Sequence, residues 1–161
     1  MLTYWHYRSK AIVKPQSQKA VTKSGDKRLE NWRILVVEDE PLTAMDVAMS
    51  LENAGAVVLG PAASEMEALH ILDQDLADGP LDGAVLDVML VDHTSERIAD
   101  RLIELGVPIV LHTANWEPNG DLTQCSTVPV IAKPAALRML IDALLKTKVD
   151  QVREDAAPVE E

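Results

Sequence analysis

The sequence lacks several features that would point to other protein classes. It has a single cysteine, Cys125, so no disulfide can form within the chain. No apolar run approaches the ~18–20 residues that a membrane span needs, and the N-terminus lacks the apolar core of a secretory signal. Basic residues are scarce in the middle, where only Arg97 and Arg101 occur between residues 34 and 132. These absences favour a cytoplasmic protein that does not contact membranes.

The chain is acidic but begins with a basic segment. Its 161 residues carry a net charge of −11, yet eight of the fifteen Lys and Arg lie in residues 1–33. An acidic domain does not suit nucleic acid, because phosphates repel it. The length favours one domain, over residues 32–148. We expect residues 1–31 to be a disordered basic leader and residues 149–161 a flexible acidic tail. Alternatively, the aromatic cluster Tyr4-Trp5-His6-Tyr7 docks on a partner or on the domain itself.

Short apolar runs alternate with segments of helical character. The expected strands are 33–38, 56–59, 82–87, 108–112 and 128–131, and the expected helices are 41–54, 63–74, 95–105 and 135–148. This alternation indicates βαβ units and a parallel sheet, and the uninterrupted apolar runs indicate strands covered on both faces. Residues 114–127 contain Pro118 and Gly120 and show no helical stripe. The helix between the fourth and fifth strands should therefore be short or absent.

Helix boundaries can also be predicted. Pro41 suits the first turn of the first helix and Gly55 its end. Ser64 and Glu67 have the spacing of a capping box at the start of the second helix. The first helix has a broad apolar face, formed by Leu42, Met45, Val47, Ala48 and Met49.

Polar side chains follow four of the predicted strands. Glu38 and Asp39 follow the first, Asp87 ends the third, and Thr113 and Lys133 follow the fourth and fifth. Taken singly, each has an ordinary explanation, such as an acidic helix start or a capping residue. The carboxyl ends of parallel strands, however, meet at one edge, where ligands bind. Three carboxylates there suit a divalent cation, and an aspartate can accept a phosphoryl group.

This combination resembles the receiver domain of two-component response regulators. The matching motifs are "VVEDE", "LDVML", "HTA" and "KP", and the resemblance covers about residues 32–147. The segments "VVEDEPL-TAMD", "VVLGPAAS", "DGAVLDV-L" and "PIVLHTA" are most similar to the single-domain receivers of alphaproteobacteria. The resemblance implies a flavodoxin-like, doubly wound sheet of five parallel strands in the order 2-1-3-4-5.

The resemblance also implies a role for each matched residue. Asp87 would be the phosphoacceptor, and Mg²⁺ would be held by Asp39, Asp87 and the backbone carbonyl of Met89. Glu38 would assist the metal through water. Lys133 would contact the phosphoryl group, and Thr113 would move toward it to transmit the signal.

Two positions depart from the family pattern. Many of the single-domain receivers carry Phe-Ala-Thr-Gly-Tyr after the fourth strand, whereas this chain keeps Thr113, lacks the glycine and carries the aromatic one position later, as Trp116. Receivers usually carry Tyr or Phe on the fifth strand, three residues before the lysine, whereas this chain has Val130. The usual coupling between threonine and aromatic ring is therefore absent. Trp116 is a candidate substitute for the readout, or else a loop aromatic that covers the acidic edge.

The expected function is that of a single-domain response regulator. It would accept a phosphoryl group from a histidine kinase or phosphotransfer protein, then act on an unknown downstream protein or serve as a phosphate sink, as a monomer or weak dimer. We do not expect an enzyme, because phosphatases that use a strand-end aspartate have a second one two residues later, where this chain has Met89. The alternative is a receiver-like interaction module that works without phosphorylation.

Overall fold

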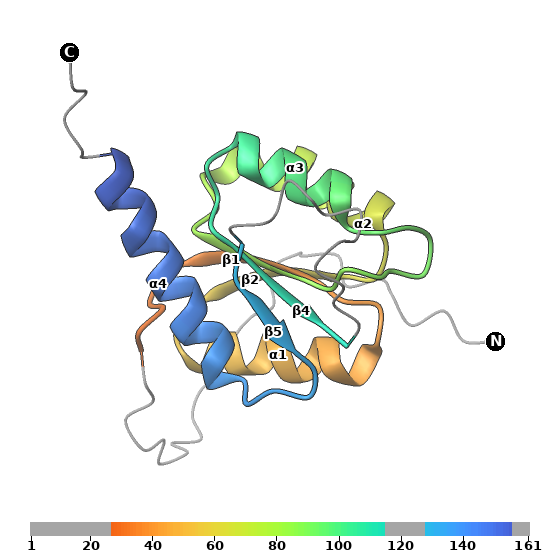
Figure 1. Cartoon of the computed structure of the whole chain (residues 1–161). Coiled ribbons are helices and arrows are strands. Elements are labelled where there is room, and N and C mark those ends of the chain that lie inside the picture. The colour runs from red at the N-terminus through yellow and green to blue at the C-terminus, as the bar shows by residue number, and fades with distance from the viewer. Residues whose placement is uncertain (1–26, 115–127, 156–161) are drawn as a thin grey trace, which may run out of the picture.

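The computed structural model describes residues 27–114 and 128–155 and shows a sheet with helices on both faces (Figure 1). The sheet has five parallel strands in the order β2-β1-β3-β4-β5, which confirms the predicted topology. The strands are β1 (Arg33–Val37), β2 (Val57–Ala62), β3 (Gly83–Leu86), β4 (Ile109–Thr113) and β5 (Val130–Ala132). The predicted short or absent helix between β4 and β5 lies outside the described residues.

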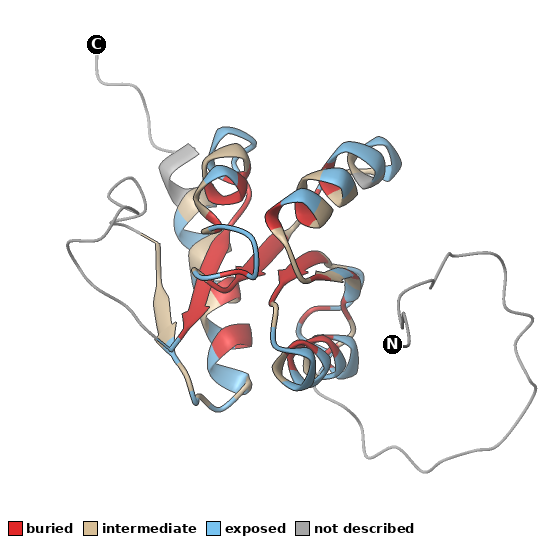
Figure 2. Cartoon of the chain, turned by 90° about the vertical axis from the view of Figure 1, so that its right-hand side faces the viewer, coloured by how far each residue is buried: buried red, intermediate tan, exposed pale blue. Residues whose placement is uncertain are grey.

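Helices α1 (Pro41–Asn53) and α4 (Arg138–Asp155) cover one face of the sheet, and α2 (Glu65–Asp75) and α3 (Glu96–Glu104) cover the other. A 3-10 turn, η1 (Leu76–Asp78), follows α2. Successive side chains of a strand point to opposite faces. In β1, Ile34 and Val36 therefore pack with α1 and α4, while Leu35 and Val37 pack with α2 and α3. The central strands are buried on both faces, as their continuous apolar runs predict (Figure 2).

The predicted start signals of α1 and α2 are confirmed, although α2 begins two residues later than the predicted residue 63. Pro41 opens α1, and the helix stops at Asn53, before Gly55. Ser64 caps α2, since its hydroxyl accepts the Glu67 N–H at 3.1 Å. The Glu67 carboxylate in turn accepts the Ala63 N–H at 2.9 Å.

The predicted ends of β2 and α4 are wrong. β2 continues through Gly60 and Pro61 to Ala62, whose carbonyl accepts the Glu38 N–H at 2.9 Å. Proline is tolerated there because β2 is an edge strand, where no neighbour needs its N–H. α4 begins at Arg138 and runs to Asp155, so the first part of the expected flexible tail is helical.

The apolar face of α1 is divided between the core and the surface. Val47 and Ala48 are buried, together with Ala44 and Leu51. Leu42, Met45 and Met49 are exposed by 69%, 52% and 52%. Only the first group of side chains faces the sheet, so the broad apolar face expected from the sequence is not one buried surface.

The folded domain begins before the predicted boundary at residue 32. Leu29 is completely buried and packs with α1 and α4. Its N–H donates to the carbonyl of Ala54 at 2.9 Å, and the Asn31 N–H donates to Gly55 at 3.1 Å. The expected disordered leader therefore ends earlier than residue 31, and residues 1–26 lie outside the described part. No helix among the described residues is long and apolar enough to cross a membrane.

Candidate functional site

The parallel strands bring the predicted polar residues to one edge of the sheet. Val37 pairs with Leu86 and Leu86 with Leu111, so the residues that follow β1, β3 and β4 emerge side by side. The Asp87 N–H donates to the Val37 carbonyl at 2.8 Å. The Lys133 N–H donates to the carbonyl of Thr113 at 2.9 Å. Backbone bonds thus join neighbouring members of the site.

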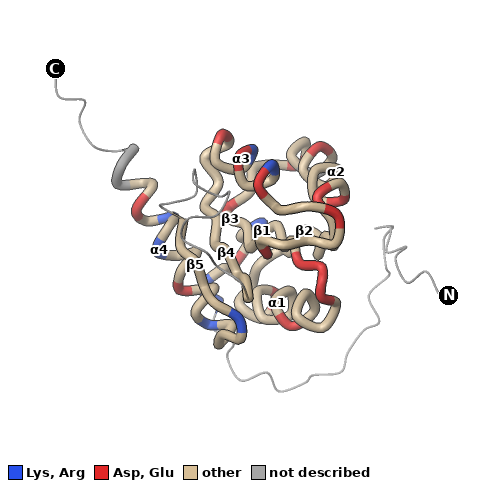
Figure 3. The backbone as a smooth tube through the Cα atoms, turned by 45° about the vertical axis from the view of Figure 1, so that its right-hand side comes forward, with Lys and Arg blue, Asp and Glu red and all other residues tan. Residues whose placement is uncertain are grey.

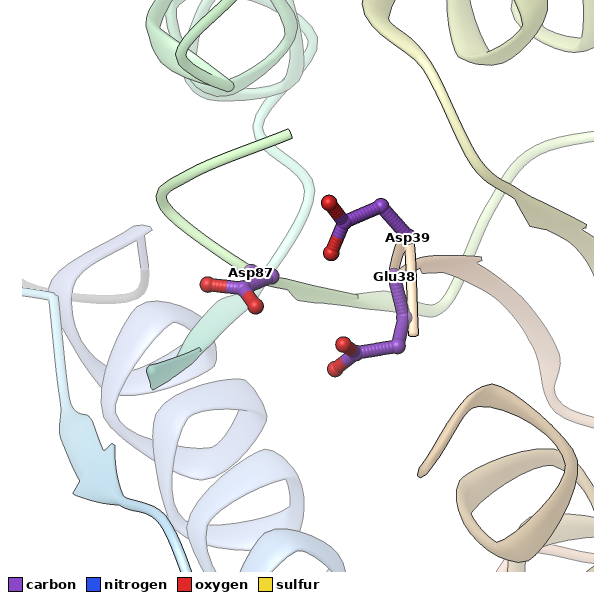
Figure 4. A group of neighbouring side chains, drawn as sticks. All are labelled: Glu38, Asp39 and Asp87. Atoms are coloured by element: carbon purple, nitrogen blue, oxygen red, sulfur yellow. The ribbon is translucent and has the colours of Figure 1, made fainter. Parts of the chain in front are cut away.

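Three carboxylates form a cluster at this edge. One carboxylate oxygen from each of Glu38, Asp39 and Asp87 lies within 4.8 Å of the other two. Figure 4 shows the Glu38 and Asp39 side chains extending from the end of β1 toward Asp87 at the end of β3. Glu38 and Asp87 are 3% and 7% exposed, and Asp39 lies closer to the surface. The sequence therefore predicted correctly which acids meet.

Lys133 is the cation that contacts this cluster. Its Nζ atom lies 2.5 Å from Oδ2 of Asp87 and 2.7 Å from Oε2 of Glu38. The lysine side chain is only 14% exposed, so these charges interact with little screening by water. Lys133 reaches from beyond β5 across to β3 and β1, which makes it the bridge between the two buried acids.

Burial and the charges of neighbouring groups act in opposite directions on the pKa values of Glu38 and Lys133. Burial raises the pKa of Glu38, although Lys133 partly offsets it. Burial also acts to lower the pKa of Lys133, but its hydrogen bonds to Asp87 and Glu38 outweigh burial and hold that pKa above its usual value. The ammonium is therefore charged at neutral pH and favours the carboxylate form of its partners.

The carboxylate cluster fits a divalent cation by charge and by donor type. Three carboxylates face one ammonium, which leaves an excess of negative charge that a cation would compensate. The Asp39 carboxylate accepts no hydrogen bond from any residue in 27–114 or 128–155, so its oxygens are available. Oxygen donors of this kind are those that Mg²⁺ prefers.

The other predicted site residues differ in how closely they join the cluster. Thr113 is the last residue of β4 and is 1% exposed. Met89 donates its N–H to Oδ1 of Asp87 at 3.3 Å, and its carbonyl as a metal ligand stays a prediction. Val130 pairs with Leu111 and packs against the core. Trp116 lies outside the described residues.

The loop after Asp87 is fixed by residues that the sequence did not single out. Glu65, at the start of α2, is 5% exposed and pairs with Arg97 at 2.7 Å. The backbone N–H of Glu65 donates to the Asp92 carboxylate at 3.0 Å. Met89 and Thr94 form an antiparallel bridge across the same loop. A lone glutamate at a helix start gives no signal of such a role, because helix starts often carry acids.

His112 is buried beside the site without a hydrogen-bond partner. Both ring nitrogens lack a partner among the described residues, and burial, followed by the charge of Lys133, lowers the pKa of the ring. The side chain therefore packs as a neutral ring at neutral pH.

Comparison with known structures decides the type of fold. A response regulator receiver protein from Sinorhizobium medicae WSM419 superposes with a TM-score of 0.63 at 23% identity, covering 76% of this chain and 98% of the other. The signal receiver domain of a modulated diguanylate cyclase from Desulfovibrio desulfuricans G20 gives 0.64 at 25% identity, covering 78% and 99%. The chain has the receiver-domain fold. The receiver fold thus places the cluster where the motifs "VVEDE", "LDVML" and "KP" predicted it.

Sequence comparison gives one curated relative of this receiver-fold chain. It is 35% identical over 105 residues to the phyllosphere-induced regulator PhyR of Methylorubrum extorquens, covering 63% of this chain and 38% of PhyR. A variant of the anti-anti-sigma factor PhyR from Bartonella quintana superposes with a TM-score of 0.59 at 24% identity, covering 81% and 53%. The chain thus spans well under two thirds of the PhyR proteins that it matches. No family model matches the sequence.

Proposed function

We propose that the protein is a cytoplasmic response regulator whose receiver domain accepts a phosphoryl group on Asp87. The observation that supports this most is the contact of Lys133 with both Asp87 and Glu38, beside the Asp39 carboxylate, which has no hydrogen-bond partner in the described part of the chain. A structural salt bridge needs one acid for each base. Two further acids at the same point are accounted for if a cation and a phosphoryl group share the site.

Phosphoryl transfer here is a matter of position and charge. A histidine kinase or phosphotransfer protein presents phosphohistidine to the carboxylate edge, and an Asp87 oxygen attacks phosphorus in line. A new O–P bond forms as the P–N bond breaks, and the electron pair returns to the imidazole nitrogen, which takes up a proton. Lys133 neutralises charge on the transferring oxygens. Asp39, Asp87 and the Met89 carbonyl, with Glu38 through water, would hold a Mg²⁺ ion, which would supply further positive charge at these oxygens.

Phosphorylation would be read out through β4 and the loop after Asp87. The modified Asp87 gains negative charge and acceptor oxygens, and the Thr113 hydroxyl can donate to them. Lys133 is then drawn from Glu38 toward the phosphoryl group. Because Lys133 and Thr113 are joined by a backbone hydrogen bond, both strand ends respond together.

The test is labelling with acetyl phosphate and Mg²⁺, followed by intact-mass measurement. The wild-type protein should gain the mass of one phosphoryl group, and Asp87→Asn should gain none. Asp78→Asn, which removes an exposed acid remote from the site, should label as the wild type does. Full labelling of the Asp87→Asn protein would reject Asp87 as the acceptor.

A second candidate function is an interaction module that works without phosphorylation. The observation that favours it is Val130 on β5. This position carries no aromatic ring that could move in response to Thr113. No mass gain in the wild type, together with no Mg²⁺ binding by calorimetry, would favour this module. In either case we propose a protein as the downstream partner, in line with the similarity to an anti-anti-sigma factor.

A further inference from the structure

The exposed side of α1 is an apolar stripe bordered by acids. Leu42, Met45 and Met49 recur at three- and four-residue spacing, so they lie on one side of the helix. Asp46 and Glu52 are exposed on either side of the stripe. α1 contains acidic residues and no basic ones (Figure 3). An apolar surface of this kind usually marks a binding site.

The chain that precedes the fold enters at the end of this helix. Leu29 and Asn31 are hydrogen-bonded to Ala54 and Gly55, the residues that follow α1. Leu29 is fully buried, which anchors the start of the described chain at that point. The leader therefore joins the described chain close to the C-terminal end of α1.

The leader, residues 1–26, has the composition that this surface requires. It contains five Lys and Arg and a single acid, Asp26, and it carries the aromatic cluster Tyr4-Trp5-His6-Tyr7. Aromatic rings pack favourably against methionine sulfur, and basic side chains complement the acids beside the stripe. The aromatic and basic content of the leader thus matches the methionines and acids of α1.

The tether is long enough for the aromatic cluster to reach the far end of α1. The 13 residues of the helix span ~20 Å at ~1.5 Å per residue. About 22 residues separate Trp5 from Lys27, and a chain of that length can span at most ~73 Å at ~3.3 Å per residue, which exceeds the length of the helix. Tethering at this length gives an effective concentration in the millimolar range. Weak contacts are then sufficient for docking.

We propose that the leader docks on the exposed face of α1 of its own chain, with the aromatic cluster over Leu42, Met45 and Met49. The docked leader would border the carboxylate edge, since Leu42 lies three residues after Asp39. This inference does not depend on phosphorylation of Asp87.

The test measures the distance of the leader from individual methionines in the full chain. A spin label is placed at Ser9→Cys in a Cys125→Ser background, and methionine methyl groups are labelled with ¹³C. The Met45 and Met49 signals should lose most of their intensity in the oxidised sample compared with the reduced one. Met66 is the matched control, because it is 76% exposed on α2, on the opposite face of the sheet.

Two further samples identify the occupant and the role of charge. In the first sample, protein with the spin label but no ¹³C is mixed with protein that carries ¹³C but no spin label. No methionine signal should fade in this mixture. The reversals Asp46→Lys and Glu52→Lys should restore the faded signals, whereas Asp78→Lys and Glu104→Lys should not. Equal fading of Met45, Met49 and Met66, or no fading, would overturn the proposal. Fading in the mixed sample would also overturn it, since the occupant would be a second copy.

Discussion

The Nζ atom of Lys133 lies 2.5 Å from Oδ2 of Asp87, although 46 residues separate them in the sequence. The same ammonium contacts Glu38, so one cation holds two buried acids together. This contact makes Lys133 a stabilising residue before any phosphoryl group arrives. If Asp87 accepts a phosphoryl group as proposed, that group would compete with an existing ion pair.

Lys133→Met should lower the free energy of unfolding at neutral pH. The change leaves two buried carboxylates side by side without their cation, at a cost of about 2 kcal/mol in metal-free buffer. Urea unfolding measures the difference. Lys148→Met is the control, because its pair with Asp82 is 3.4 Å long and about one third exposed. The control should cost under ~1 kcal/mol. If both variants lost the same free energy of unfolding, the contacts of Lys133 would stabilise the fold no more than an exposed ion pair does.

Stability should depend on pH through Glu38. Burial raises the pKa of its carboxyl group above 4.5, so the folded protein holds this proton at pH values where the unfolded chain has released it. Its contribution to stability therefore falls as pH rises through a window that begins near 4.5 and ends at the raised folded value. Lys133 stays charged throughout, because its pKa is raised above 10.5.

The matching experiment compares unfolding free energies of the wild type and Glu38→Gln across that window in the presence of a chelator. The wild-type value minus the variant value should fall as pH rises. Glu52→Gln, at an exposed site on α1, should show no such trend. A difference for Glu38 that grew with pH would mean that its folded-state pKa is lowered instead.

Leu29→Ala should destabilise the domain although Leu29 precedes the first strand. The side chain is fully buried against α1 and α4, and truncation of such a leucine costs about 2–5 kcal/mol. Leu42→Ala, at a leucine that is 69% exposed, should change stability by less than ~0.5 kcal/mol. Chemical denaturation of both variants provides the check. If Leu29→Ala left the stability unchanged, the folded domain would begin at residue 32, as the sequence predicted.

Gly60→Ala should cost more than Gly106→Ala. Both glycines have positive φ, 93° and 67°, so both variants pay backbone strain of about 1 kcal/mol. A Cβ at Gly60 would also lie 2.7 Å from the Val36 carbonyl oxygen, whereas nothing lies within 4 Å of one at Gly106. The additional cost should appear as a lower melting temperature for Gly60→Ala. Equal melting temperatures would mean that β2 can move away from Val36 without loss of stability.

The fold class and the members of the acidic cluster were predictable from local pattern. A run such as Ile34 to Val37, apolar at every position, requires a layer on both faces, and alternation with helices requires parallel strands. Parallel strands place their carboxyl ends at one edge. Glu38, Asp39, Asp87 and Lys133 therefore had to lie near one another once the strands were recognised.

Tertiary contacts alone decided which apolar side chains are covered. In α1, apolar residues occur around much of the helix, and its position on the sheet buries Val47 and Leu51 while leaving Met45 and Met49 in solvent. Leu29 has no periodic pattern around it and is buried only because the chain crosses the end of α1. Chemical type and spacing determine which strands and acids exist. Which side of a helix faces the core depends on the neighbours that it meets, because burial belongs to the packed molecule and not to any local run of residues.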